Sequence, residues 1–342
     1  MRQVKISRWL ASAVVCSLIL AAGCAPAGKE AAKPEVKVEK QIPKPKTGKV
    51  ATIALKFSPQ DSTTYRVITE AERSIKWEGN VPDEPAFKGG HNHDRHEMTF
   101  AQEIQSIDDK GNVVAKITIK SLKYSSIVKD SPLFEFDSSK PKDPNHPLAM
   151  LIGQSYTIKI APTGEIIDVI DTKEAETAAR KGSVPPGAAL KLLNTDVIKE
   201  RHGGLLLPDT DKNRLHIGDH WSVTRTFAFG MMGSESYEKI YTLNSIEDQD
   251  NRQVAIIKMN AIPASETSKE QATKFSKKSD QTKTYTGELE LDLTAGKIKK
   301  YNEKLQQEWT TAFPSTGQQT AQEEPVILNV SAARSYSIEK ID

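Results

Sequence analysis

Apolar and polar residues alternate along much of the chain with a period of two, which is typical of half-buried strands. In the first half the alternation covers residues 64–77, 98–107, 113–122, 154–160 and 165–169. The segments 108–112 and 162–164 between them supply Asp, Asn and Gly, which tolerate the positive φ of tight turns. Residues 172–181 and 186–201 predict two helices, the second with Pro186 at its start and Gly203-Gly204 behind it.

The second half of the chain repeats this order of elements. Ser106-Ile107-Asp108-Asp109 reappears as Ser245-Ile246-Glu247-Asp248 about 140 residues later, and similar strand sequences follow each copy. A duplication explains the match. The alternative is that two antiparallel meanders share turn chemistry without common origin.

The predicted fold is therefore mainly β with a few helices. We expect two tandem antiparallel repeats, either β-meanders or half-barrels, over residues 51–205 and 206–342. Each sheet would be apolar on one face, which a helix, the other copy or a ligand must cover.

The first 23 residues have the form of a signal peptide. Arg2, Lys5 and Arg8 precede fourteen mostly apolar residues from Trp9 to Ala22. A membrane-spanning helix needs about 20 apolar residues, so export with removal of the segment is the better interpretation.

The segment Leu20-Ala21-Ala22-Gly23-Cys24 resembles the lipobox of bacterial lipoproteins, with Ala21 where a larger aliphatic residue is usual. The resemblance implies a lipidated Cys24. The alternative is an ordinary secretory signal, which leaves Cys24 as a bystander thiol. Ala25, where some bacteria use Asp as an inner-membrane signal, favours the outer membrane if two membranes exist.

Residues 24–50 combine the lipidated cysteine with a tether rich in Lys, Glu, Ala and Pro, a composition typical of disorder. Without the leader, 44 basic residues face 45 acidic ones, because the leader removes three of the 47 basic residues. No basic surplus or reading motif points to nucleic acid. Cys16 leaves with the leader, so the processed chain has no cysteine pair for a disulfide.

Three segments of the body resemble a family of bacterial envelope lipoproteins with a β-meander body: Gly153-Gln154-Ser155 through Gly164, Gly218 with Asp219-His220-Trp221, and residues 287–297. The resemblance implies a lipid anchor and a sheet-rich body facing water. The predicted sheets are also loosely similar to the half-barrels of periplasmic lipoprotein carriers, whose concave apolar face holds acyl chains. That similarity concerns shape alone.

Motifs for catalysis are missing from the sequence: it has no Gly-x-Ser-x-Gly elbow, phosphate-binding glycine loop or zincin helix motif. We therefore expect no catalytic residues and no cofactor. Three of the seven histidines, His91, His93 and His96, lie close together on a predicted glycine-led loop. They are speculative metal ligands, and the alternative is an exposed polar loop. His146, His202, His216 and His220 are expected at surfaces or turns.

Large aromatic residues recur in both halves, where they either line a lipid cavity or fill a core. They are Tyr65, Trp77, Phe100, Tyr124, Trp221, Phe227, Phe229 and Tyr237.

Together these patterns predict a non-catalytic, membrane-anchored envelope lipoprotein that binds or carries an apolar or amphipathic molecule. Its partners would be membrane lipid through Cys24 and a hydrophobic ligand. The alternatives are a structural lipoprotein that supports an envelope assembly through a protein partner, and a metal-binding protein that uses the His91–His96 region.

The lipobox generates the first test, the intact mass and membrane fractionation of the full-length chain beside Cys24→Ala. We expect a mature mass that begins at residue 24 plus acyl chains, and membrane association that the variant loses. Each buried acyl methylene contributes about 0.8 kcal/mol to anchoring. An unmodified wild-type chain in the soluble fraction would exclude the anchor.

Overall fold

The structure is a computed structural model that describes residues 48–79, 81, 88–140, 142–228, 234–264, 280–313 and 326–341. The chain divides into two compact units, Met1–Pro45 and Lys46–Asp342, and every described residue belongs to the second. The signal segment, Cys24 and the tether up to residue 47 lie outside the described residues. No helix in the described part is long and apolar enough to cross a bilayer.

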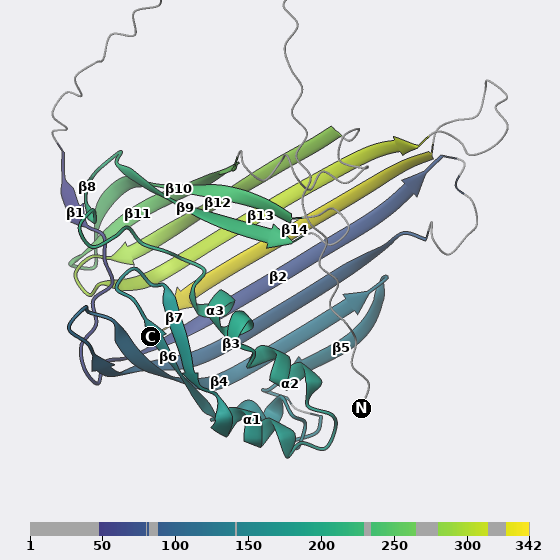
Figure 1. The fold of residues 1–342 in the computed structure, drawn as a ribbon, viewed down its shortest axis with the longest axis horizontal. Coiled ribbons are helices and arrows are strands. Elements are labelled where there is room, and N and C mark those ends of the chain that lie inside the picture. Colours follow the sequence, from purple (N-terminus) through teal and green to yellow (C-terminus); the bar gives the residue numbers. More distant parts are fainter. Residues whose placement is uncertain are drawn as a thin grey trace, which may run out of the picture. The chain divides into compact units, whose positions relative to one another are not determined.

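Twelve strands of the described residues form one antiparallel sheet (Figure 1). Their order is β7-β6-β4-β3-β2-β14-β13-β12-β11-β10-β9, and β5 pairs with β4 beside this path. The short strands β1 (Val50–Thr52) and β8 (Arg214–His216) pair separately. The strands of the sheet are β2 (Ser62–Glu78), β3 (Gly90–Ile107), β4 (Val113–Val128), β5 (Ser131–Asp137), β6 (Ser155–Ile160), β7 (Ile166–Asp171), β9 (His220–Ala228), β10 (Ser234–Gln249), β11 (Arg252–Pro263), β12 (Asp280–Asp292), β13 (Lys297–Phe313) and β14 (Val326–Lys340).

The mainly β prediction is confirmed, but the two halves of the chain share one continuous sheet. Residues before 206 supply one side of it and residues after 206 the other, and the two sides meet where β2 pairs with β14. Both sides have a bulge at the sequence match: the register shifts between Ile104 and Ser106 in β3 and between Leu243 and Ser245 in β10. The bulges agree with the match, while duplication itself stays a prediction.

Three α-helices occur in the described residues, and all come from the first half of the chain. They are α1 (Lys173–Arg180), α2 (Gly187–Leu192) and α3 (Thr195–His202). The predicted helix over 186–201 is thus two helices. The chain leaves the helical path at Asn194, whose side chain caps α3 by accepting a hydrogen bond from the Asp196 backbone N–H at 2.9 Å.

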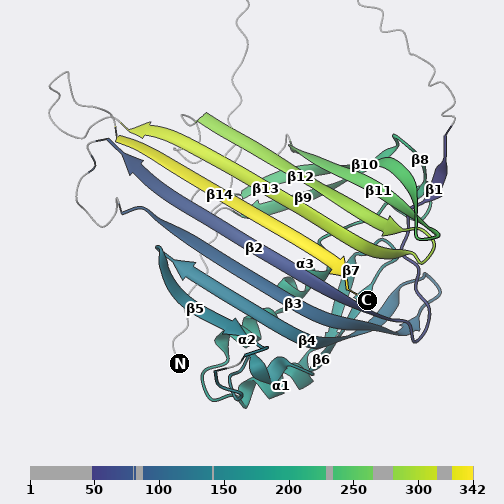
Figure 2. The same cartoon turned by 180° about the vertical axis from the view of Figure 1, so that it is seen from behind.

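The helices lie on one face of the sheet, which we call the covered face (Figure 1). Tyr65 and Val67 of β2 point to this face and are buried, whereas Arg66 between them points to the opposite face. That opposite face, the outer face, has no described helix over it (Figure 2). The period of two in the sequence therefore separates a packed side from a polar one.

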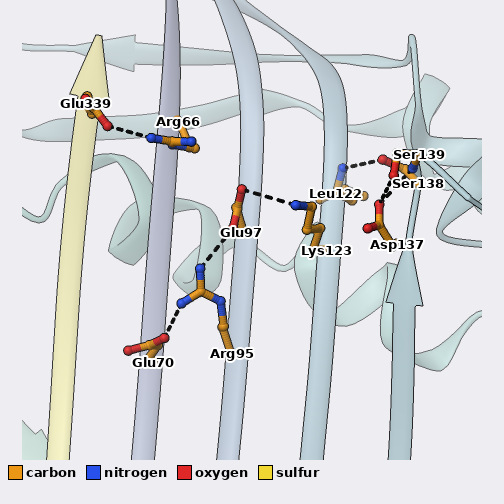
Figure 3. A network of polar contacts seen from close by, with 10 residues as sticks. All are labelled: Arg66, Glu70, Arg95, Glu97, Leu122, Lys123, Asp137, Ser138, Ser139 and Glu339. Atoms are coloured by element: carbon orange, nitrogen blue, oxygen red, sulfur yellow. Dashed lines mark hydrogen bonds and ion pairs between the residues drawn. The ribbon is translucent and has the colours of Figure 1, made fainter. Parts of the chain in front are cut away.

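Charged side chains form a network on the outer face (Figure 3). Arg95 of β3 donates to Glu70 of β2 and, at 3.0 Å, to Glu97. Lys123 of β4 lies 4.0 Å from Glu97, and Arg66 donates to Glu339 of β14 at 2.7 Å. These cross-strand pairs are compatible with a face in contact with water, where each contributes at most about 1 kcal/mol.

The sheet curls so that β10 lies over β13 on the covered face. In a flat sheet, the two strands would be about 14 Å apart, because they are three strand spacings of about 4.8 Å apart. Instead, Lys239 of β10 forms an ion pair with Glu303 of β13, and these side chains are only 2% and 8% exposed. The hydroxyls of Tyr285 and Tyr301 also donate to Glu303, so the buried carboxylate accepts hydrogen bonds from three side chains.

The chain that follows α3 runs inside this curl. The Gly204 carbonyl accepts a hydrogen bond from Lys239 Nζ at 3.3 Å. A Cβ on Gly204 would lie 2.4 Å from the Tyr336 ring, so any residue other than glycine would require that ring to move. The Tyr336 hydroxyl donates to the Arg201 carbonyl at 2.9 Å. Helix α3 is thereby attached to the centre of the sheet.

The buried ion pair generates a stability test. Lys239→Met leaves the Glu303 charge uncompensated, so we expect the free energy of unfolding to fall by about 3–5 kcal/mol. Adding Glu303→Gln removes that charge, and the double variant should be more stable than the single one. Urea denaturation followed by tryptophan fluorescence measures both changes.

The matched control is Arg66→Met, which breaks a half-exposed ion pair and should cost at most about 1 kcal/mol. Equal losses at Lys239 and Arg66, or a double variant weaker than Lys239→Met, would contradict a structural role for the buried pair.

Candidate ligand-binding cavity

A cavity of about 220 Å³ lies between the covered face and helices α2 and α3. Strands β2, β3, β4 and β14 form its floor, and β9 reaches it from the curled edge of the sheet. Apolar side chains supply much of the lining, namely Val67, Met98, Leu122, Leu192, Val197, Phe227 and Leu305.

Strand alternation and helix packing explain these positions. Met98 and Phe100 of β3 share the covered face, and both are buried. The extra residue Lys120 in β4 shifts its register, so that Ile119 and Leu122 both reach the same face. Above them, α3 directs Val197 toward the cavity, while Ile198 is buried in the core.

Three arginines border the cavity. Arg201 of α3 is 6% exposed and donates to the Leu192 carbonyl at 2.9 Å and to the Tyr156 hydroxyl at 3.4 Å. Arg225 of β9 donates to the carbonyls of Gly203 and Gly204, each at 3.4 Å. No carboxylate of the described residues forms a salt bridge with either guanidinium, so the hydrogen-bond partners of both are uncharged.

Arg334 of β14 approaches the same place from the sheet. Its guanidinium lies 5.6 Å from the centre of the Phe227 ring, and the guanidinium of Arg225 lies 5.9 Å from that centre. Glu200 of α3 is 3.9 Å from Arg334. Two cations therefore meet at one aromatic ring beside the cavity, an arrangement that also favours each cation through the ring's π electrons.

His96 adds a polar group to the cavity wall. Its ring packs edge-on against Tyr124 with the centroids 4.2 Å apart, and its Nε2 atom is buried without a hydrogen-bond partner. Burial, and then the charge of Arg201, lower the pKa of His96 to about 4. The imidazole is therefore neutral at pH 7 and adds no positive charge to that of the arginines.

Glu303, the most deeply buried of the acidic residues in the wall, already has hydrogen-bond and ion-pair partners. Lys239, Tyr285 and Tyr301 all bind its carboxylate, and burial followed by the charge of Glu303 raises the pKa values of both tyrosines. The cavity thus combines an apolar floor with cationic donors at one side, a composition typical of sites for amphipathic ligands.

The three predicted metal ligands do not come together. Strand β3 begins at Gly90, so the segment predicted as a loop is a strand, and that prediction is wrong. His91 and His93 lie on the outer face with ring centroids 6.1 Å apart, whereas His96 points to the covered face. Among the described residues no group of three His, Cys, Asp or Glu side chains is placed to hold a metal ion.

The aromatic residues that were predicted to line a cavity or to fill a core are found in both places. Tyr124 and Phe227 line the cavity, whereas Tyr65, Phe100 and Tyr237 are buried in the core, and Phe229 lies outside the described residues. His202, expected at a surface or turn, instead binds the Tyr156 hydroxyl at 2.6 Å and packs on Phe100. That expectation is wrong.

The sequence reasoning missed the arginines. Arg225 lies two residues before Phe227, and Arg334 lies two residues before Tyr336, so each occupies an inward position on an amphipathic strand. An arginine at a position where the alternation of the strand predicts an apolar residue is the sequence feature that could have identified them.

No family model matches the chain. No curated protein matches it either. Among solved structures, lipovitellin, in a structure concerned with lipid–protein interactions, is similar with a TM-score of 0.43 and 12% identity over 84% of this chain. This chain spans 26% of the lipovitellin chain. OpdQ of Pseudomonas aeruginosa gives a TM-score of 0.18 and 9% identity over 82% of this chain and 99% of its own. The similarity to lipovitellin concerns a large antiparallel sheet, and at these scores neither structure supports a functional argument.

The lowered pKa of His96 predicts how stability depends on pH. As pH falls below about 6.5, the unfolded chain binds a proton before the folded chain does, so stability present at pH 7 is lost toward pH 4. Between pH 7 and pH 4.5, we expect the free energy of unfolding to fall less in His96→Gln than in wild type. The two decreases should differ by at most about 3 kcal/mol. Urea denaturation at both pH values measures the difference. The control His220→Gln changes an exposed histidine, and a pH dependence that follows His220 rather than His96 would contradict the assignment.

Proposed function

We propose that this chain is a membrane-anchored lipoprotein of the cell envelope whose β body binds an apolar or amphipathic molecule without catalysing a reaction. The cavity between the covered face and α2–α3 carries the proposal, because it combines Val67, Met98 and Leu305 with cationic donors in one site. Pockets of this composition bind ligands whose one end is apolar and whose other end is polar.

The polar outer face supports the assignment to a body in water. Its strands expose ion-paired side chains such as Arg66 with Glu339 and Arg95 with Glu70, which suit an aqueous surface (Figure 3). The apolar residues instead converge on the covered face, around the cavity. A ligand in that cavity would lie between the sheet and the helices α2 and α3.

The amino-terminal segment supports the anchor. The resemblance of residues 20–24 to a lipobox implies an acylated Cys24 at the start of the mature chain. If residues 25–47 extend at about 3.1 Å per residue, they span up to about 70 Å between the membrane and the body. Such a body would meet its ligand at or near the membrane surface.

Exposed apolar residues at the β5 and β7 side of the sheet favour a second candidate, an interaction lipoprotein that supports an envelope assembly. Leu133 of β5 is 70% exposed and Ile170 of β7 is 50% exposed. Edges of this kind accept a protein partner. This candidate predicts cross-links to a protein at β5 and β7 rather than a ligand in the cavity.

Filling the cavity tests the binding function. We expect Val197→Trp to reduce the labelling of cavity residues by a photoreactive alkyl probe at least tenfold, because the indole occupies the ligand's space. The full acylated chain in lipid nanodiscs is labelled, and the adducts are located by mass spectrometry.

Val184→Trp is the matched control, since Val184 is 45% exposed outside the cavity and should leave labelling unchanged. Wild-type labelling that never reaches cavity residues, or that is equal in both variants, would overturn the proposal.

A further inference from the structure

We propose that the cavity is selective for a single-chain amphiphile with a carboxylate or phosphate head group, which Arg225 and Arg334 bind beside Phe227. This inference rests on the proposed binding function and specifies the ligand. It follows from the charge, the geometry and the size of the cavity.

Charge gives the first step. Arg201 and Arg225 place two guanidinium groups at the cavity, and every hydrogen-bond acceptor found for them is a neutral carbonyl or hydroxyl oxygen. Taking a cation out of water is costly unless an anion compensates it. His96 adds no charge to the cavity, because its imidazole is neutral at pH 7. An anionic ligand would supply the missing counter-charge.

The acidic residues around the cavity do not fulfil that role. Glu303 is held by Lys239 and two tyrosine hydroxyls. Glu70 and Glu97, which also border the cavity, both accept hydrogen bonds from Arg95 on the outer face, and Asp94 is exposed on β3. Glu200 is also exposed on α3 and lies 3.9 Å from Arg334, in high dielectric where an ion pair is weak. A ligand anion can therefore compete for Arg334 and meet no fixed carboxylate at Arg225.

Geometry gives the second step. The guanidinium groups of Arg225 and Arg334 both lie within 6 Å of the Phe227 ring centre, so two different strands each contribute a cation beside one ring of the cavity wall. Each presents paired N–H donors that match two oxygens of a carboxylate or phosphate. The unpartnered Nε2 of His96 adds a third polar group to the same cavity.

Size gives the third step. The cavity measures about 220 Å³, below the range of about 300–1,000 Å³ typical of pockets for drug-sized ligands. It suits one alkyl chain, or part of one, better than the several chains of a membrane lipid. Met98, Leu122 and Leu192 provide the apolar surface against which such a chain would pack.

Three photoreactive probes with the same alkyl chain test the inference, one each with a carboxylate, a phosphate and a hydroxyl head. Each is added to the full acylated chain in lipid nanodiscs, and adducts on cavity residues are quantified by mass spectrometry. We expect an anionic probe to label the cavity at least tenfold more than the alcohol. The preferred anionic head distinguishes a fatty acid from a phosphate-headed lipid.

Variants identify the groups responsible. Arg225→Gln and Arg334→Gln should each weaken binding of the anionic probe about ten- to a hundredfold, the effect of losing a hydrogen bond to a charged group. Arg225→Lys keeps the charge and should restore part of the binding. The matched control is Arg66→Gln, which changes an arginine of the outer face and should leave binding of the anionic probe unchanged. The midpoints of urea denaturation confirm that each variant folds.

The outcomes separate the two proposals. Equal labelling by the alcohol and the anions, or anion labelling that survives both arginine variants, overturns the head-group inference and leaves the binding function standing. Absence of cavity adducts with all three probes overturns the binding function itself.

Discussion

The architecture depends on the buried contact between β10 and β13. Lys239 and Glu303 come from strands that sheet order separates by β11 and β12, so their contact requires the sheet to bend onto itself. Tyrosine hydroxyls from β12 and β13 also donate hydrogen bonds to Glu303. An ion pair so deeply buried gains little net stability, but it fixes which strands meet. The curl in turn brings β9, with Arg225 and Phe227, to the cavity.

Much of the fold could be predicted from local patterns. Alternation located β2, β6 and β7 to within two residues and the start of β4 at Val113, although β4 continues six residues beyond the predicted end. The pattern is clearest in β6 and in the first half of β4, where every second residue is buried. Strand β3 was predicted to start near Met98 but begins at Gly90, since His91, His93 and Arg95 are polar residues on the outer face that pair with β2. The helix over 186–201 was predicted as one element, because its break at Asn194 is a capping event that periodicity does not reveal.

Less of the site could be predicted. The cavity depends on the pairing of β2 with β14 and on the curl of β9, and neither leaves a local pattern in the sequence. The histidine cluster suggested a metal site because its members are close in sequence, yet strand alternation puts His96 on the opposite face of the sheet from His91 and His93. The cations that do converge, Arg201, Arg225 and Arg334, are far apart along the chain. Their convergence is tertiary and needs the complete sheet.

The pairing of β2 with β14 also constrains how the protein reaches its native state. Arg66 and Glu339 join these strands although 273 positions separate them in the sequence. Contacts of such long range close a large loop, so they form slowly and late in folding. Until they form, β2 remains a seventeen-residue edge with unpaired backbone groups, open to other chains. The strand at which the two halves of the finished sheet join is thus the one that stays open to premature self-association until β14 pairs with it.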